Sequence, residues 1–279
     1  MKSFENKVAA ITGAGSGIGR ALALSLAAQK CALSLSDVNE NGLAETAKLL
    51  ENSGVKVTTA KVDVAQRQQM HDWAAQTLAD HGKVNLIFNN AGVAVAGTVE
   101  GLGYDDYEWI MGINFWGVVY GTKEFLPHLK ASGDGHVINV SSVFGLFAQP
   151  SQSAYNATKF AVRGFTESLR QELDIARNGV SATCVHPGGI KTNIAKSART
   201  NASMSALTGK DPEKMTADFE KMFRTTADEA ARVILAGVRN NDRRVLIGSD
   251  ARALDILQRL LPTGYQKLVT RALRAQSKR

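Results

Sequence analysis

A tyrosine and a lysine four residues apart, Tyr155 and Lys159, are the side chains whose spacing most clearly suits chemistry. If residues 154–176 form a helix, both side chains lie on one helical face. An unperturbed tyrosine has a pKa of about 10, which is too high for an efficient base at neutral pH. A neighbouring ammonium group would favour the phenolate. Because Tyr-x-x-x-Lys pairs are common on helix surfaces, the pair alone does not establish acid/base chemistry.

Two polar residues earlier in the chain could act with this pair. Ser142 follows the predicted strand 136–141 directly, so its hydroxyl can point into the same cleft and hold a substrate oxygen. Asn114 lies among apolar neighbours in the predicted helix 106–131, where a satisfied core amide is the alternative interpretation. We interpret His186 as a structural residue at a strand end and not as a second acid/base.

A glycine-rich turn at residues 12–19 separates the first predicted strand from the first predicted helix. Its glycines allow a sharp turn and let the backbone approach a pyrophosphate at the helix N-terminus. A merely structural turn is the alternative, but the position between a strand and a helix argues against it. We expect the cofactor to contact Gly13, Ser16, Gly17, Ile18 and Gly19.

The residues after the next strands indicate which nucleotide binds. Asp37 lies about 20 residues beyond the glycines, where a carboxylate can accept hydrogen bonds from ribose hydroxyls; a helix cap is the alternative. A 2′-phosphate would face this negative charge, so we expect NAD, although Arg20 leaves use of NADP open. Residues at the ends of the third and fourth strands should also line the cofactor site: Asp63, Val64, Asn90, Ala91 and Gly92.

The elements that position these residues alternate between strand and helix. The pattern predicts strands at residues 7–12, 31–36, 55–60, 84–88, 136–141, 180–185 and 244–247. It predicts helices at 18–29, 40–52, 66–80, 106–131, 154–176 and 228–238. This alternation indicates an α/β fold with one Rossmann-like, doubly wound parallel sheet of about seven strands and helices on both faces. Ligands bind at the carboxyl edge of such sheets.

The length, composition and charge of the chain indicate how many domains it forms and which partners it binds. A chain of 279 residues with 44% apolar residues can form one domain, residues 1–279. We find no signal segment and no apolar run of about 18 residues, and we expect a cytoplasmic protein without a disulfide. The net charge is +7, of which residues 251–279 supply +6, seven basic residues against Asp255. Because the rest of the chain is nearly neutral and shows no nucleic-acid module, we expect no nucleic-acid partner. We also expect no metal.

Two segments depart from the alternation. Residues 188–225 are polar and too long for an ordinary connection, which predicts a substrate lid. Residues 251–279 form a basic amphipathic C-terminal extension that Pro262 and Gly264 divide into two short helices. Such a surface could contact an anionic membrane. We favour the alternative that its leucines pack on the lid or on a neighbouring subunit.

With these residues in this order, the sequence resembles the short-chain dehydrogenase/reductase family from about residue 7 to residue 192. The glycine turn, Asp63 and the Asn-Asn-Ala-Gly segment at 89–92 match the family's motifs. The family's catalytic tetrad matches four unsubstituted positions: Asn114, Ser142, Tyr155 and Lys159.

The resemblance implies a role for each of these side chains. Tyr155 would be the general acid/base, and Lys159 would lower its pKa and bind the nicotinamide ribose. Ser142 would orient the substrate oxygen, and Asn114 would hold a water that links Lys159 to solvent. The segment after the sixth strand would bind the nicotinamide carboxamide through the Ile190 backbone and the Thr192 hydroxyl. The residues that match the family's Pro-Gly segment and would contact the cofactor are Pro187, Gly188, Ile190 and Thr192. The resemblance also implies a homo-oligomer, a dimer or a tetramer, packed through helices 106–131 and 154–176.

The expected function is that of a NAD(P)-dependent oxidoreductase that interconverts a secondary alcohol and a ketone or aldehyde. A bulky apolar substrate is favoured, because several apolar residues near the tetrad could line a pocket or belong to the core: Val93, Trp116, Phe144, Leu146 and Phe147. One alternative is a dinucleotide-binding sensor or scaffold without catalysis. Another is a lyase or epimerase on the same scaffold.

Overall fold

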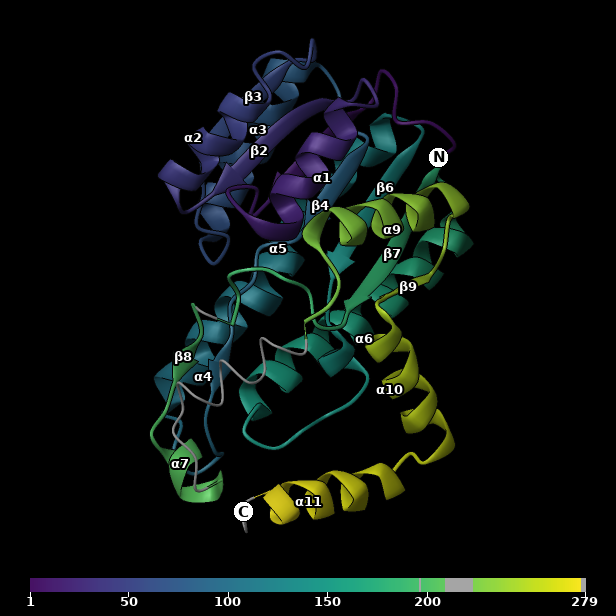
Figure 1. Ribbon diagram of the computed structural model, residues 1–279. Coiled ribbons are helices and arrows are strands. Elements are labelled where there is room, and N and C mark those ends of the chain that lie inside the picture. The colour runs from purple at the N-terminus through teal and green to yellow at the C-terminus, as the bar shows by residue number, and fades with distance from the viewer. Residues whose placement is uncertain (196, 209–222, 277–279) are drawn as a thin grey trace.

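The computed structural model describes residues 1–195, 197–208 and 223–276, and a parallel sheet of seven strands lies at its centre (Figure 1). The strands are β1 Val8–Thr12, β2 Ala32–Asp37, β3 Val57–Lys61, β4 Leu86–Asn89, β6 Gly135–Val140, β7 Val180–Pro187 and β9 Arg244–Ile247. Their order in the sheet is β3-β2-β1-β4-β6-β7-β9, and the neighbouring strands pair in parallel. The predicted α/β fold with a doubly wound sheet is confirmed.

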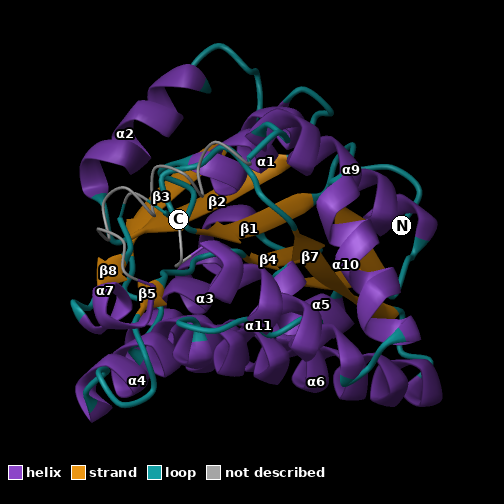
Figure 2. Cartoon of the chain, turned by 60° about the horizontal axis from the view of Figure 1, so that its bottom comes forward, coloured by secondary structure: helices purple, strands orange, loops and turns teal. Residues whose placement is uncertain are grey.

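Helices cover both faces of the sheet, as Figure 2 shows. On one face lie α1 Gly17–Ala27, α2 Glu40–Leu49 and α9 Ala227–Asn240, and on the other α3 Arg67–His81, α5 Gly117–Ala131 and α6 Ser153–Ala176. Strand side chains alternate between the faces: Ile11 packs in the cluster with α1 and α9, while its neighbour Ala10 packs in the cluster with α3, α5 and α6. Burial on both sides explains why the strands read as continuous apolar runs.

The strand order reverses between β1 and β4, which makes a topological switch point. The chain leaves β1 toward β2 and returns to the other side of β1 as β4. The helices after β1 and β4 therefore lie on opposite faces of the sheet, and open α/β sheets bind ligands in a crevice at the carboxyl edge beside such a point. The glycine turn follows β1, and residues 90–92 follow β4, so the fold brings these two segments together.

The predicted long helix 106–131 is present, but it is not regular. It begins at α4 Tyr104–Met111, widens into a π-helical turn, η1 Gly112–Trp116, and continues as α5. A π-helical turn inserts one extra residue into the helical ladder and occurs frequently at functional sites. The 3.6-residue periodicity on either side conceals it, because α4 and α5 remain amphipathic.

The first part of the predicted lid, residues 188–225, contains structure that periodicity does not reveal. A short strand, β8 Arg199–Thr200, pairs in parallel with β5 Val95–Ala96, and α7 Ser203–Thr208 follows. Arg199 also lies over the Trp109 ring, 3.6 Å from its centroid. Strands of two residues are too short to show alternation. Residue 196 and residues 209–222 of the predicted lid lie outside the described residues.

The C-terminal extension forms two helices, α10 Ser249–Leu260 and α11 Gly264–Gln276, as the positions of Pro262 and Gly264 predict. In Figure 1, α10 leads away from β9, and α11 crosses below α6 toward α7. Tyr265 anchors α11, because its ring lies 4.5 Å from that of Phe147 and its hydroxyl accepts a hydrogen bond from the Ala148 amide. Three of the predicted packing leucines remain exposed: Leu261, Leu268 and Leu273.

Residues 277–279, with two of the seven basic residues of the extension, lie outside the described part of the chain. Among the described residues, no helix has the length and apolar character needed to cross a membrane.

Candidate active site

The glycine turn shapes the start of α1 for an anion. Gly13 and Gly17 have φ angles of +66° and +52°, which L side chains rarely adopt. A Cβ atom on Gly19 would lie 2.1 Å from the Gly13 carbonyl oxygen, so the helix passes very close to the turn. Ser16 is the N-cap of α1, and its side chain makes no capping hydrogen bond in the described part of the chain. The first amides of α1, starting near Ile18, are therefore suited to bind a phosphate.

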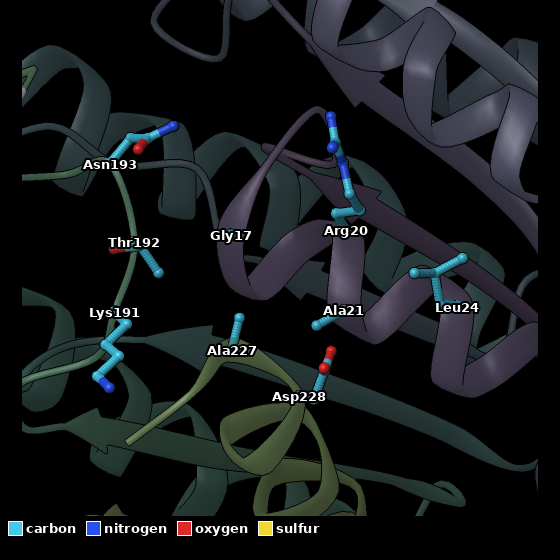
Figure 3. A pocket seen from close by; sticks show the side chains of 9 residues that line it. All are labelled: Gly17, Arg20, Ala21, Leu24, Lys191, Thr192, Asn193, Ala227 and Asp228. Atoms are coloured by element: carbon cyan, nitrogen blue, oxygen red, sulfur yellow. The ribbon is translucent and has the colours of Figure 1, made fainter. Parts of the chain in front are cut away.

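A cavity of about 270 Å³ lies beside this turn (Figure 3). It is bounded by the start of α1, by residues 191–193 and by the start of α9. A Cβ atom on Gly17 would lie 3.1 Å from Cγ2 of Thr192, so the threonine side chain faces the glycine turn directly. Lys191 adds a cation to the lining. Thr192 therefore lies against the glycine turn, and the cavity opens beside this contact.

Asp37 is the last residue of β2, and its carboxylate faces the glycine turn. Oδ2 accepts a hydrogen bond from the Gly15 amide at 2.8 Å, and Oδ1 accepts one from the Asn39 amide at 2.9 Å. The N-cap of α2 is Asn39, whose side chain accepts from Gly42. The alternative interpretation of Asp37 as the helix cap is therefore wrong. A carboxylate has about four lone-pair sites, so both oxygens can still accept ribose hydroxyls.

Arg20 joins the glycine turn to α2. Its Nε donates to the hydroxyl of Thr46, and its Nη2 contacts the carbonyl oxygens of Gly15 and Gly42 and the carboxylate of Glu45. Arg20 also lines the cavity beside the turn. That Arg20 leaves use of NADP open therefore stays a prediction.

The segment after β4 is tied to the segment after β1. The Thr12 hydroxyl accepts hydrogen bonds from the amides of Asn90 and Ala91 at 2.9 and 3.0 Å. The Asn90 side chain returns a hydrogen bond to the Thr12 carbonyl oxygen at 2.9 Å. A Cβ atom on Gly13 would lie 2.9 Å from the Ala91 Cα atom. The two loops therefore form one wall of the crevice.

Asp63 and Val64 lie just beyond the end of β3. Oδ1 of Asp63 accepts a hydrogen bond from the Ala65 amide at 3.0 Å, an Asx turn that leaves the carboxylate half-buried at the sheet edge. Val64 is buried against Gly117 of α5, where a Cβ atom would lie 2.8 Å from Val64 Cγ2. Both residues thus lie at the carboxyl end of β3.

Ser142 and Tyr155 lie near each other at the sheet edge. Ser142 follows β6 and Tyr155 lies in the first turn of α6, and the Ser142 side chain lowers the pKa of the phenol. The Ser142 oxygen accepts a hydrogen bond from the Phe144 amide at 3.1 Å. Tyr155 is 9% exposed, and the Phe144 ring packs edge-on against its ring, with 6.2 Å between the ring centroids. The phenol is thus buried between Phe144 and the loop that carries Ser142.

Lys159 lies one helical turn beyond Tyr155, with its side chain buried. Nζ donates to the Val140 carbonyl oxygen at 3.1 Å and lies 5.5 Å from the centroid of the Tyr155 ring. A Cβ atom on Gly92 would lie 3.5 Å from this Nζ and 3.2 Å from Oδ1 of Asn114. Tyr155, Lys159 and Asn114 therefore converge beside the segment after β4.

Asn114 lies in the π-helical turn and is completely buried. Its amide pairs with the Val93 backbone in both directions: Oδ1 accepts from the Val93 amide at 2.8 Å, and Nδ2 donates to the Val93 carbonyl oxygen at 2.9 Å. Nδ2 also donates to Thr158 Oγ1 at 3.2 Å. The asparagine therefore joins the segment after β4 to α6, next to Lys159, and Oδ1 retains a lone pair for a further donor.

Burial is the largest cause of the pKa shifts of Tyr155 and Lys159. It raises the pKa of Tyr155 to about 12, and the hydrogen bond with Ser142 lowers that pKa only in part. Burial also lowers the pKa of Lys159 to about 8. The expected lowering of the Tyr155 pKa by Lys159 is therefore not found in the chain alone, because desolvation disfavours both charged forms. A positive group bound nearby would favour the phenolate.

His186 is buried behind Ser142. Its Nδ1 lies 2.8 Å from the Ser142 carbonyl oxygen, and burial lowers the pKa of the ring to about 4. Since a carbonyl oxygen only accepts, Nδ1 carries the proton of the neutral ring. This contact is that of a structural residue, as the sequence suggested.

The segment after β7 carries the remaining predicted residues. Pro187 ends β7, Ile190 forms a bridge with Thr225, and the Lys191 amide donates to the Thr225 carbonyl oxygen at 2.9 Å. The segment therefore returns to the sheet edge and presents Thr192 to the glycine turn.

Sequence reasoning missed three residues that shape this site. The Thr12 hydroxyl joins the loops after β1 and β4, and its place just before the glycines was the only signal. Asp250 contacts the segment after β7, and Tyr265 packs on the loop after Ser142. No local pattern points to the last two, because their partners lie far away in the sequence.

Comparison with known proteins gives consistent matches. The family model described as short chain dehydrogenase matches residues 7–203. A putative oxidoreductase, SadH, of Mycobacterium tuberculosis is 49% identical over 270 residues, which cover 96% of each chain. Human estradiol 17-beta-dehydrogenase 11 is 31% identical over 98% of this chain and 85% of its own length. The structure of a short-chain dehydrogenase/reductase from Burkholderia phymatum in complex with NAD superposes with a TM-score of 0.87 at 31% identity and covers 94% of this chain and 96% of that one.

Proposed function

Because this chain belongs to the short-chain dehydrogenase/reductase family, we propose that it is a NAD-dependent oxidoreductase that interconverts a secondary alcohol and a ketone. The observation that carries the proposal is the convergence of three buried side chains: Lys159 Nζ lies 5.5 Å from the centroid of the Tyr155 ring, and the Ser142 side chain lowers the pKa of the same phenol. A sensor or scaffold would not need this buried arrangement, because it costs desolvation of two ionisable groups. Bound NAD supplies the hydride acceptor.

The proposed proton transfer takes place at the phenolic oxygen. In alcohol oxidation, Tyr155 accepts the hydroxyl proton while Ser142 holds the same substrate oxygen, and in ketone reduction Tyr155 returns the proton. The raised pKa of Tyr155 favours the acid form in the chain alone. The positive charge of oxidised nicotinamide would shift the balance toward the phenolate needed for oxidation.

We propose that Lys159 and Asn114 complete the proton path. Lys159 Nζ is buried and retains donors beyond its hydrogen bond to Val140, so it can bind a ribose hydroxyl. Asn114 Oδ1 and Lys159 Nζ both lie beside Gly92. Oδ1 can hold a water molecule there that exchanges protons with solvent.

The choice of NAD over NADP rests on Asp37 and Arg20. The Asp37 carboxylate lies at the Gly15 amide, where the adenosine ribose would bind, and would repel a 2′-phosphate. The guanidinium of Arg20 already contacts four groups of the protein. Side-by-side kinetics with both cofactors test this choice.

For the substrate we propose a bulky apolar alcohol or ketone. The Phe144 ring lies edge-on against Tyr155, and half-buried Val93 lies close to Asn114, so apolar surface adjoins the phenol. Leu146 and Phe147 belong to the buried interior, and exposed Trp116 stacks on Tyr120. The match to an estradiol dehydrogenase agrees with an apolar substrate.

We also propose a homo-oligomer that packs through α5 and α6. Large apolar side chains are exposed on α6 and just before α5: Phe160 and Ile175 of α6, and Trp116 of the π-helical turn that leads into α5, are exposed by 39–83%. Exposed apolar groups of this size commonly mark subunit contacts.

The test of the proposed function is the Tyr155→Phe variant, with NADH formation measured on a panel of apolar secondary alcohols. Loss of the proton carrier should lower turnover by about 100- to 10,000-fold, because this is the usual contribution of general acid/base catalysis. NAD binding, measured by fluorescence titration, should stay close to that of the wild type. Tyr120→Phe, which removes a hydroxyl from a surface ring, is the matched control.

Turnover in Tyr155→Phe comparable to that of the wild type would refute the assignment of the proton carrier. If the wild type binds NAD but forms no NADH from any alcohol and reduces no ketone with NADH, the scaffold alternative gains support. Product analysis with NAD present separates oxidation from a lyase or epimerase reaction, because only oxidation gives one NADH per product.

A further inference from the structure

The Asp250 carboxylate, in the first turn of α10, contacts the segment after β7. Its Oδ2 accepts a hydrogen bond from the Gly189 amide at 2.6 Å, across 61 residues of sequence. The neighbouring Gly188 amide donates to the Ile247 carbonyl oxygen at 2.9 Å. The backbone between Pro187 and Ile190 is therefore held by the end of β9 and the start of α10.

Two glycines leave room for this carboxylate. A Cβ atom on Gly188 would lie 2.2 Å from Asp250 Oδ2, and one on Gly248 would lie 2.3 Å from Oδ1. Real Cβ atoms do not approach that closely, so a larger residue at 188 would displace either the backbone or the aspartate. The contact is thus a close fit between α10 and the segment after β7, at the surface of the protein.

The helix that carries Asp250 is itself fastened to the helix that carries Tyr155 and Lys159. Asp255 of α10 is buried and pairs with Arg259 at 2.9 Å and with Arg244 at 3.5 Å. Arg244 also pairs with Glu167 of α6 at 2.5 Å. A chain of charged contacts therefore fixes α10 relative to α6.

We propose that Asp250 is a positioning residue that sets the carboxamide-binding segment, residues 187–192, relative to the catalytic helix α6. This inference rests on the proposed function, since it assumes that the segment binds nicotinamide. Asp250 does not touch the reacting atoms. It acts through the Gly189 amide, whose position decides where the Ile190 backbone and the Thr192 hydroxyl meet the cofactor.

The test compares Asp250→Ala with Asp250→Asn, in which Oδ1 of the amide can still accept from Gly189. Loss of a hydrogen bond to a charged group should raise the KM and Kd for NAD by about 10-fold in Asp250→Ala. The change in kcat should be smaller, because Tyr155, Ser142 and Lys159 keep their own contacts. Asp250→Asn should restore NAD affinity to within about 2-fold of the wild type. Arg252→Ala, at an exposed position on the same helix, is the matched control and should bind NAD like the wild type.

A second comparison uses the close fit at Gly188. Gly188→Ala should weaken NAD binding strongly in the wild-type background, because its methyl group would collide with Asp250. In the Asp250→Ala background the collision is relieved, so the additional loss should be small. This non-additivity is expected of two groups in contact and not of independent sites.

Equal NAD affinity in the wild type and Asp250→Ala would overturn the proposal, as would an equal effect of Gly188→Ala in both backgrounds. If Asp250→Ala does not fold, Asp250→Glu replaces it and should show the same rise in KM, because the carboxylate moves by one methylene group. A wild type that binds no NAD would instead refute the proposed function.

Discussion

The buried imidazole of His186 makes the stability of the protein depend on pH in a defined range. The ring is 0% exposed, and its Nδ1 donates to the carbonyl oxygen of Ser142. Its Nε2 has no protein partner among the described residues. Burial lowers the pKa of the ring from its ordinary value of 6.5 to about 4.

The size of the effect follows from these two pKa values. Below about pH 6.5 the unfolded chain binds a proton on this ring, but the native chain does not bind one until about pH 4. The free energy of unfolding should therefore fall as the pH decreases through this interval, by about 3 kcal/mol in full and by about 2 kcal/mol between pH 7 and pH 5. His136, whose pKa burial lowers to about 3, should contribute a similar loss.

The assay is urea unfolding at several pH values between 7 and 5 and at a fixed protein concentration. His186→Asn keeps an amide donor for the Ser142 carbonyl oxygen but does not titrate, so its loss over this range should be smaller than that of the wild type by about 2 kcal/mol. His128→Asn, at a half-buried position near the end of α5, controls for the removal of a histidine elsewhere. If His186→Asn loses stability as steeply as the wild type, the buried imidazole is not the source of the pH dependence.

Three further predictions concern the cofactor, the assembly and the lid. Asp37→Ala should weaken NAD binding by about 10-fold, since it removes a charged acceptor, while the affinity for NADP should rise; a wild type that already prefers NADP would contradict the choice of cofactor. Light scattering at micromolar concentration should show a dimer or tetramer, and a monomer would rule out packing through α5 and α6. Trypsin should cut the ligand-free protein first within residues 188–225, and NAD with substrate should slow that cleavage; equal rates in both states would count against a lid.

The alternation of strands and helices could be predicted because it depends on local periodicity. Each apolar run buried on both faces of the sheet reads as a strand, and the sequence therefore indicated seven strands and their directions. Parallel strands place their carboxyl ends at one edge, so the glycine turn, Asp37 and Ser142 could be assigned to one crevice without coordinates. The spacing of Tyr155 and Lys159 determined that they share a helical face.

Only the tertiary structure decided what surrounds these groups. Asn114 of the π-helical turn pairs with Val93, a residue of another segment. The direction of the Tyr155 pKa shift depends on burial, which no local pattern gives. The sequence does not show that α2 supplies three partners of Arg20: Gly42, Glu45 and Thr46.

The hydrogen bond between Asp250 and Gly189 could not be predicted from local sequence patterns, because it joins residues 61 positions apart. Periodicity within a segment reports which face of a helix or strand is buried, and a turn motif reports local backbone geometry. Hydrogen bonds, desolvation and ion pairs between segments depend on where distant elements pack, and this is determined by the folded chain as a whole.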